Sequence, residues 1–286
     1  MDLFLDALID TLLDGVKLLP FLLITYLIME YLEHKASSKS QKIIEKSGKF
    51  GPLIGSILGV FPQCGFSAAA SNLYAGRIIT LGTLISIYLS TSDEMLPIFI
   101  SEQVPLPLIL KVLGIKVAIG MISGFVIDFV YRRLTHNKKE NLRIEHMCDH
   151  EHCHCNEGHF VKSAITHTLQ VFGFILIITL ILNLVIEYIG ENTISDFLAN
   201  KAILSVFLSG LVGLIPNCAA SVIITQLFLE GFLGFGAMIA GLLVGAGVGL
   251  IVLFRVNDDI KENIRITLVL YIVGVIFGIA ISLLYM

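Results

Sequence analysis

The chain carries one short motif twice, 154 residues apart, and this duplication decides its fold. The first copy is Pro62-Gln63-Cys64-Gly65-Phe66-Ser67 and the second is Pro216-Asn217-Cys218-Ala219-Ala220-Ser221. At the same offset, Ser71-Asn72-Leu73-Tyr74 lies over Thr225-Gln226-Leu227-Phe228. Two apolar stretches always share some leucines, whereas this pattern also matches a proline and several polar residues. We therefore predict a two-fold internal repeat.

The composition places both copies of the repeat in a membrane. The chain has 286 residues, of which 56% are hydrophobic and 15% charged, and its mean hydropathy is +0.87. An average soluble domain is roughly 45–50% apolar and about 25% charged. Apolar runs of about 18–25 residues predict an all-α polytopic membrane protein and exclude an outer-membrane barrel. The net charge of −4 gives no reason to expect nucleic acid as a partner.

Basic residues suggest how the chain crosses the membrane. Lys and Arg gather in 34–50, 132–143 and 255–265, which predicts that these segments face the cytoplasm. An even number of crossings then separates the first two, yet 51–77 is too short for two spans of about 20 residues. We therefore predict that 51–77 is a re-entrant hairpin with the first Pro-Cys motif at its tip.

The second half then repeats this arrangement with the opposite orientation in the membrane. Each half has about three spans plus one hairpin, so the odd number of crossings gives two inverted repeats. The second hairpin, 202–230, enters from the outside, and both tips meet near the bilayer midplane. The competing interpretation treats 51–77 as one kinked span, which makes the repeat parallel. The domains are a first transmembrane repeat over 1–132, a cytoplasmic metal-binding loop over 133–160 and a second repeat over 161–286.

The hairpin tips are the first candidate substrate site. Matching broken segments in two halves are the best sequence indication of a transporter site, because unwound backbone exposes carbonyl and amide groups. The alternative is that Pro and small residues only allow close helix packing. The tip residues and those after them are Gln63, Cys64, Ser67, Asn72, Asn217, Cys218, Ser221 and Gln226.

An acidic break in the apolar stretch is the second candidate. Ser92, Asp93 and Glu94 follow Ser90-Thr91, and their repeat counterparts include Gly247 and Val248, which carry no charge. Ionisable groups inside a span are costly and mark function by default. Carboxylates suit a hard cation such as Mn²⁺, or the group that couples transport to protons. The alternative places the break at the outer interface.

Further polar groups could form a pathway or couple transport to protons. A stripe of three aspartates recurs every four residues near the N-terminus, and a 157-residue offset pairs its second member with a histidine and one glutamate with another. A solvated interfacial helix face, with glutamates reaching the membrane surface, is the competing interpretation. These residues are Asp6, Asp10, Asp14, Glu30, His167 and Glu187.

The polar loop between the halves is rich in soft metal ligands. Imidazole and thiolate groups suit Zn²⁺ and other soft metals. The irregular spacing predicts loose, exchangeable binding that collects or senses metal rather than translocating it. The ligands are His146, Cys148, His150, His152, Cys153, His154, Cys155 and His159.

With both Pro-Cys motifs, Thr91-Ser92-Asp93-Glu94-Met95-Leu96-Pro97 and the His/Cys loop in view, the chain resembles a known family. It is similar to the manganese transporters of bacteria and archaea that are also described as ArsP-like heavy-metal exporters or arsenic efflux proteins. The resemblance covers essentially the whole length. It implies an inner-membrane efflux permease without an ATPase domain, usually described with ten transmembrane segments. Six spans plus two hairpins reach ten only if each hairpin arm is counted.

Three hypotheses follow. The first is a secondary-active exporter of a divalent metal cation, foremost Mn²⁺, coupled to protons and needing no cofactor beyond the transported ion. The second is a thiol-dependent permease for arsenite or organoarsenicals, using Cys64 and Cys218. The third is a membrane-embedded enzyme or metal sensor, but the duplicated architecture favours transport. The substrate, the coupling ion, the direction and the oligomeric state, a homodimer included, stay open.

Overall fold

The computed structural model describes residues 48–61, 64–92, 94–134, 202–215 and 218–285, with isolated positions at 23, 165, 166, 168, 169, 173, 176, 177 and 180. Apart from those isolated positions, the first repeat before residue 48, the second repeat from 161 to 201 and the eight His and Cys ligands of the loop therefore lie outside the described residues. All regular structure in the described ranges is helical.

Two sets of helices follow one another in the same order. The first set is η1 (Gly48–Phe50), α2 (Gly51–Gly59), α3 (Cys64–Ala75), α4 (Leu81–Ser90), α5 (Met95–Ser101) and α6 (Leu106–Leu134). The second is α9 (Ala202–Gly213), α10 (Cys218–Leu229), α11 (Phe235–Val244), α12 (Val248–Val256) and α13 (Ile260–Leu284). Within the described chain, Leu106–Tyr131, Phe235–Val256 and Ile260–Leu284 are long and apolar enough to cross a membrane.

The same turn closes the equivalent helices α3 and α10. In α3, the backbone N–H of Ile78 donates to Leu73 O at 2.9 Å. In α10, Phe232 donates to Leu227 O at the same distance, and both residues of this bond lie 154 positions after those of the first. Arg77 and Gly231, which are equivalent, both have positive φ, at 59° and 79°. This left-handed residue after a helix is the usual C-terminal cap, and glycine adopts it most easily. The repeat therefore extends to backbone hydrogen bonds.

Helices α2, α4 and α6 pack through small residues. Gly82 on α4 lies against the backbone of Gly124 on α6, and Gly120 lies against Ser86, so α4 and α6 run antiparallel. Gly51, at the start of α2, lies against Thr83, and Gly59, at its end, lies against Ser90. Helices α2 and α4 are therefore parallel. Since each starts at the same end of the bundle, the connection through α3 must lead back to that end.

The second set repeats this packing. Gly236 on α11 lies against Gly278 and Ser282 on α13, and Gly274 lies against Val244, so these helices are antiparallel. Helix α9 packs beside α11, with Gly213 against Gly241 and Val244. Small residues let the backbones approach closely, and they are enriched where membrane helices pack together.

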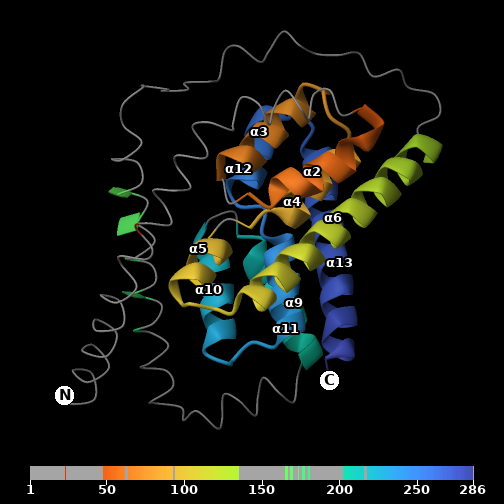
Figure 1. The fold of residues 1–286 in the computed structure, drawn as a ribbon. Coiled ribbons are helices and arrows are strands. Elements are labelled where there is room, and N and C mark those ends of the chain that lie inside the picture. The colour runs from red at the N-terminus through yellow and green to blue at the C-terminus, as the bar shows by residue number, and fades with distance from the viewer. Residues whose placement is uncertain are drawn as a thin grey trace, which may run out of the picture.

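Helix α3 packs mainly on the opposite set, whereas α10 contacts both sets. Helix α3 lies beside α12, and α10 contacts α5 (Figure 1). At the end of α3, the Arg77 guanidinium forms two 2.9 Å bonds to the Glu262 carboxylate, and the Tyr74 hydroxyl donates to the same carboxylate at 2.6 Å. This ion pair brings the first turn of α13 to the end of the bundle where α2 starts and α6 finishes. The described parts of all three basic segments therefore lie at one end.

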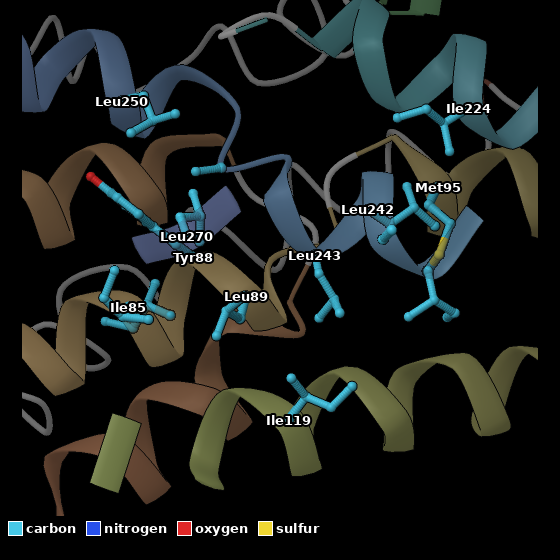
Figure 2. Close-up of a cluster of buried hydrophobic side chains, with 14 of the residues drawn as sticks. Ile85, Tyr88, Leu89, Met95, Ile119, Ile224, Leu242, Leu243, Leu250 and Leu270 are labelled. Atoms are coloured by element: carbon cyan, nitrogen blue, oxygen red, sulfur yellow. The ribbon is translucent and has the colours of Figure 1, made fainter. Parts of the chain in front are cut away.

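Both sets contribute to one hydrophobic core. Figure 2 shows Ile85 and Leu89 of α4 in the same cluster as Leu243 of α11 and Leu270 of α13. Ile119 of α6 closes this cluster, and all five residues are buried. Two of these helices, α4 and α11, are interrupted just after Leu89 and Leu243.

Candidate functional site

Two helices are interrupted at equivalent places. Helix α4 ends at Ser90 and α5 begins at Met95, while α11 ends at Val244 and α12 begins at Val248. Thr91 and Gly245 leave the helical conformation with ψ of 130° and 90°. The last carbonyls of a helix lack intrahelical donors, so each break presents free acceptors inside the bundle. The break that the sequence predicts after Ser90 therefore separates two helices, α4 and α5.

The first break is polar and buried. Ser90, Thr91 and Ser92 are each at most 3% exposed, and Glu94 is 4% exposed. The Ser90 hydroxyl donates to Ser86 O at 2.8 Å, and Ser92 donates to Ser90 O at 3.1 Å. These hydroxyls thus donate their protons to backbone carbonyls, and their oxygen lone pairs stay available as acceptors. A buried carboxylate beside such oxygens is a natural environment for a hard cation.

Lys116, which the sequence reasoning missed, joins the two breaks. Its side chain on α6 is fully buried. The ammonium donates to Thr91 O in the first break and, at 2.8 Å, to Leu242 O in the last turn of α11. Lys116 lies near the middle of the span Leu106–Tyr131, so both breaks lie near the middle of the bundle. The signal that could have found it is a lysine near the middle of an apolar helix, where charges are rare and functional.

Hydroxyl groups gather where α3 meets α12. Ser71 Oγ donates to Gly249 O at 2.8 Å and lies 2.7 Å from the Tyr88 hydroxyl, which itself lies 3.1 Å from Gly249 O. Ser67, one turn earlier on α3, is buried, and its Cβ lies 2.8 Å from where a Cβ on Gly249 would sit. Gly249 therefore has to be glycine for α3 and α12 to approach this closely.

The second arm has matching residues with fewer cross-contacts. Thr225 Oγ1 donates to Ser221 O at 2.6 Å, and the single hydroxyl proton of Ser71 is shared between the equivalent Ser67 O and Gly249 O, each 2.8 Å from Oγ. Gln226 is 3% exposed, while its counterpart Asn72 is half-buried. The predicted polar residues on α3 and α10 are thus placed in the bundle interior or at its edge.

Several predicted residues are not described. Of the motif thiols, the structure gives the helix position alone: Cys64 starts α3 and Cys218 starts α10. Among the described residues, no three His, Cys, Asp or Glu side chains come close enough to hold one metal ion. The predicted residues outside the described part are Gln63, Asp93, Asn217, Asp6, Asp10, Asp14, Glu30, His167, Glu187, His146, Cys148, His150, His152, Cys153, His154, Cys155 and His159.

One family model matches the chain over residues 2–187 and 156–285, which together span nearly all of it. The model is ArsP_2, with the description "Putative, 10TM heavy-metal exporter". The chain belongs to this family. No curated protein and no solved structure matches it significantly.

Membership in the heavy-metal exporter family confirms the resemblance drawn from the two Pro-Cys motifs. It establishes an all-helical, multi-span membrane protein of a transporter family rather than an enzyme family. For an exporter, two broken helices whose ends meet beside a buried carboxylate are the described feature best suited to binding an ion, because unwound carbonyls replace hydration oxygens.

Proposed function

We propose that this chain is a secondary-active exporter of divalent metal cations, with Mn²⁺ as the foremost candidate and protons as the coupling ion. One observation carries the proposal: the buried Glu94 and the carbonyls of Thr91 and Leu242 come from the two interrupted helices, and both carbonyls converge on Lys116 near the middle of the bundle. Carboxylate and carbonyl oxygens suit Mn²⁺. The sequence contains no Walker-type nucleotide motif, which favours ion coupling over direct ATP use.

We propose further that the two halves are inverted repeats with re-entrant hairpins. Two contacts support this. Helix α6 finishes at the end of the bundle where α13, its counterpart, begins, since Asp128 accepts from Thr80 at 2.7 Å and Glu262 pairs with Arg77 in the same turn of chain. Helix α2 starts at that same end and α3 returns to it. The chain then enters and leaves on one side, with the Pro-Cys tip inside the membrane.

The orientation follows from charge. The basic segments 34–50, 132–143 and 255–265 meet at one end in their described parts, and this end is proposed to face the cytoplasm of the cell's inner membrane. The His/Cys loop 133–160 would then collect Zn²⁺ or another soft metal at the entrance. Asp93, Gln63, Asn217, Asn72 and Gln226 would complete the oxygen shell of the transported ion.

Transport in proteoliposomes tests the proposal. Purified protein is reconstituted, and fluxes of Mn²⁺, Zn²⁺, Co²⁺ and arsenite are measured with and without a pH gradient. Glu94→Gln and Asp93→Asn should abolish Mn²⁺ movement. Glu102→Gln removes an exposed carboxylate at the end of the same helix α5 and should leave it unchanged. Mn²⁺ flux that persists in both break variants would contradict the assignment of the site.

The alternative is a thiol-dependent exporter of arsenite or organoarsenicals. It is favoured by the equivalent positions of Cys64 and Cys218, each the first residue of the helix that follows a hairpin tip. Movement of arsenite alone, lost in the Cys64→Ser/Cys218→Ser double variant, would establish this alternative. Mn²⁺ movement that is unaffected by that double variant would refute it.

A further inference from the structure

Lys116 is a buried cationic side chain whose role in the protein has to be explained. A charged group in a membrane span is costly unless its surroundings compensate for the lost water. Lys116 has no exposed surface and lies about ten residues into the span that starts at Leu106. The proposed function assigns it no part in binding the substrate, since neither the oxygen shell nor the thiols include it.

The ammonium lies at the negative ends of two half-helices. Thr91 is the C-cap of α4, and Leu242 is in the last turn of α11, so Lys116 bonds to carbonyls that the helices leave free. Helix dipoles favour a cation at a C-terminus, and here two such ends converge on one ammonium. Carbonyls at unwound half-helix ends are also what coordinate ions in transporters. The groups that hold Lys116 would therefore hold a free cation equally well.

The positive charge of Lys116 has no counterpart in the second half. The position equivalent to Lys116 is Leu270, and the second break, Gly245-Ala246-Gly247, has no ionisable side chain. Glu94 lies in the first break and is buried. Carbonyls and a carboxylate gathered in a low-dielectric interior carry a large unfavourable energy when no cation is near them. Lys116 supplies that cation from within the chain.

We propose that Lys116 is a tethered cation that fills the shared site at the ends of α4 and α11 whenever the transported metal is absent. The inference rests on the proposed function, because it needs a metal that binds at these breaks. A lysine stem is flexible, so the ammonium leaves the carbonyls when the metal arrives and returns when it is released. Net export requires the empty protein to reorient, and Lys116 neutralises the site during that step.

The test separates net movement from exchange. Proteoliposomes loaded with radioactive Mn²⁺ are diluted either into metal-free medium, which reports net efflux, or into medium with unlabelled Mn²⁺, which reports metal-for-metal exchange. Lys116→Met should lower net efflux by at least about tenfold, because the empty site loses its cation, and leave exchange within about twofold. The matched control is Lys111→Met on the same helix, whose ammonium lies 4.4 Å from the centre of the Tyr285 ring. Both fluxes should stay within about twofold in that control.

A second variant covers the case in which Lys116→Met does not fold. Lys116→Gln keeps donors for the carbonyls and removes the charge. It should reproduce the selective loss of net efflux. A folded Lys116→Gln protein with wild-type net efflux would overturn the inference, and so would an equal loss of both fluxes. A wild-type protein that moves no metal in either assay would overturn the proposed function and this inference with it. Wild-type transport together with unchanged variants would overturn the inference alone.

Discussion

The two helix breaks share a backbone and differ in chemistry. Thr91 and Gly245 interrupt their helices at equivalent positions, and each is the residue that ends its helix. The first break carries hydroxyls and a buried carboxylate, while the second consists of small residues, with Gly247 at a φ of 54°. A side chain at that φ is strained, so glycine suits the position. Duplication thus supplied two copies of one scaffold, and a single copy holds the charge.

Moving the carboxylate from the first break to the second tests most directly whether the two breaks differ in function. Glu94→Val should lower Mn²⁺ flux by at least about 10- to 100-fold, as loss of a metal-site residue does. Adding Val248→Glu places a carboxylate at the equivalent position of the second break, yet flux should stay low. The reason is that the surroundings of the two breaks are not symmetric. Lys116 contacts both helix ends from α6, and α13 offers no second lysine because the counterpart of Lys116 is Leu270. Flux in proteoliposomes measures this, and recovery in the double variant would mean that the halves are interchangeable.

The helix contacts should respond equally in both halves. Gly124 and Gly278 are equivalent, and an added Cβ would lie 2.6 Å from Gly82 O in one case and 2.5 Å from Ala240 Cβ in the other. Gly124→Ala and Gly278→Ala should each lower the free energy of unfolding by about 1–3 kcal/mol. Gly114→Ala on α6 meets nothing within 4 Å and should be neutral or slightly stabilising. Unfolding in detergent micelles reports all three. A Gly114→Ala cost as large as the others would point to helix propensity rather than packing.

The left-handed caps should reveal a hidden strain in the first half. Arg77 has a φ of 59°, where its counterpart is glycine, so Arg77→Gly should be about 1 kcal/mol more stable than Arg77→Ala. Both variants lose the ion pair with Glu262, which the difference between them cancels. Gly231→Ala should cost a similar amount, because the space around Gly231 is open and its φ alone matters. The free energies of unfolding of these variants provide the measurement, and equal stability of Arg77→Gly and Arg77→Ala would contradict the strain.

The smallest expected effect separates the two arms. Ser71 bonds across to the second half through Gly249 O, whereas the bond described for Thr225 Oγ1 stays within α10. Ser71→Ala should cost about 0.5–1.5 kcal/mol of unfolding free energy. Thr225→Val, which keeps the shape and removes the hydroxyl, should cost less than Ser71→Ala. Comparison of the two variants by unfolding in detergent decides the point, and a reversed order would show that α10 makes the stronger contact.

Local features of the fold could be read from the sequence, and distant ones could not. The motif pair Pro62-Gln63-Cys64 and Pro216-Asn217-Cys218 marked where α2 and α9 end, because proline and small polar residues interrupt an apolar helix. The acidic stretch after Ser90 marked the break between α4 and α5 for the same local reason. Lys116 escaped notice because two of its partners, Thr91 O and Leu242 O, are backbone atoms that lie 25 and 126 residues away. Backbone carbonyls carry no residue identity, so no sequence pattern could have named them.

The packing of α3 on α12 of the other half has a consequence for biosynthesis. The Ser71 hydroxyl finds Gly249 O across 178 residues of chain. At translation rates of about 5–20 residues per second, α12 follows α3 out of the ribosome after roughly 10–35 s. During that interval the polar face of α3 has no α12 to cover it, although its own half is already made. The nascent first half therefore needs protection in the membrane until α12 has been made. A chain truncated before α12 should be degraded by quality-control proteases.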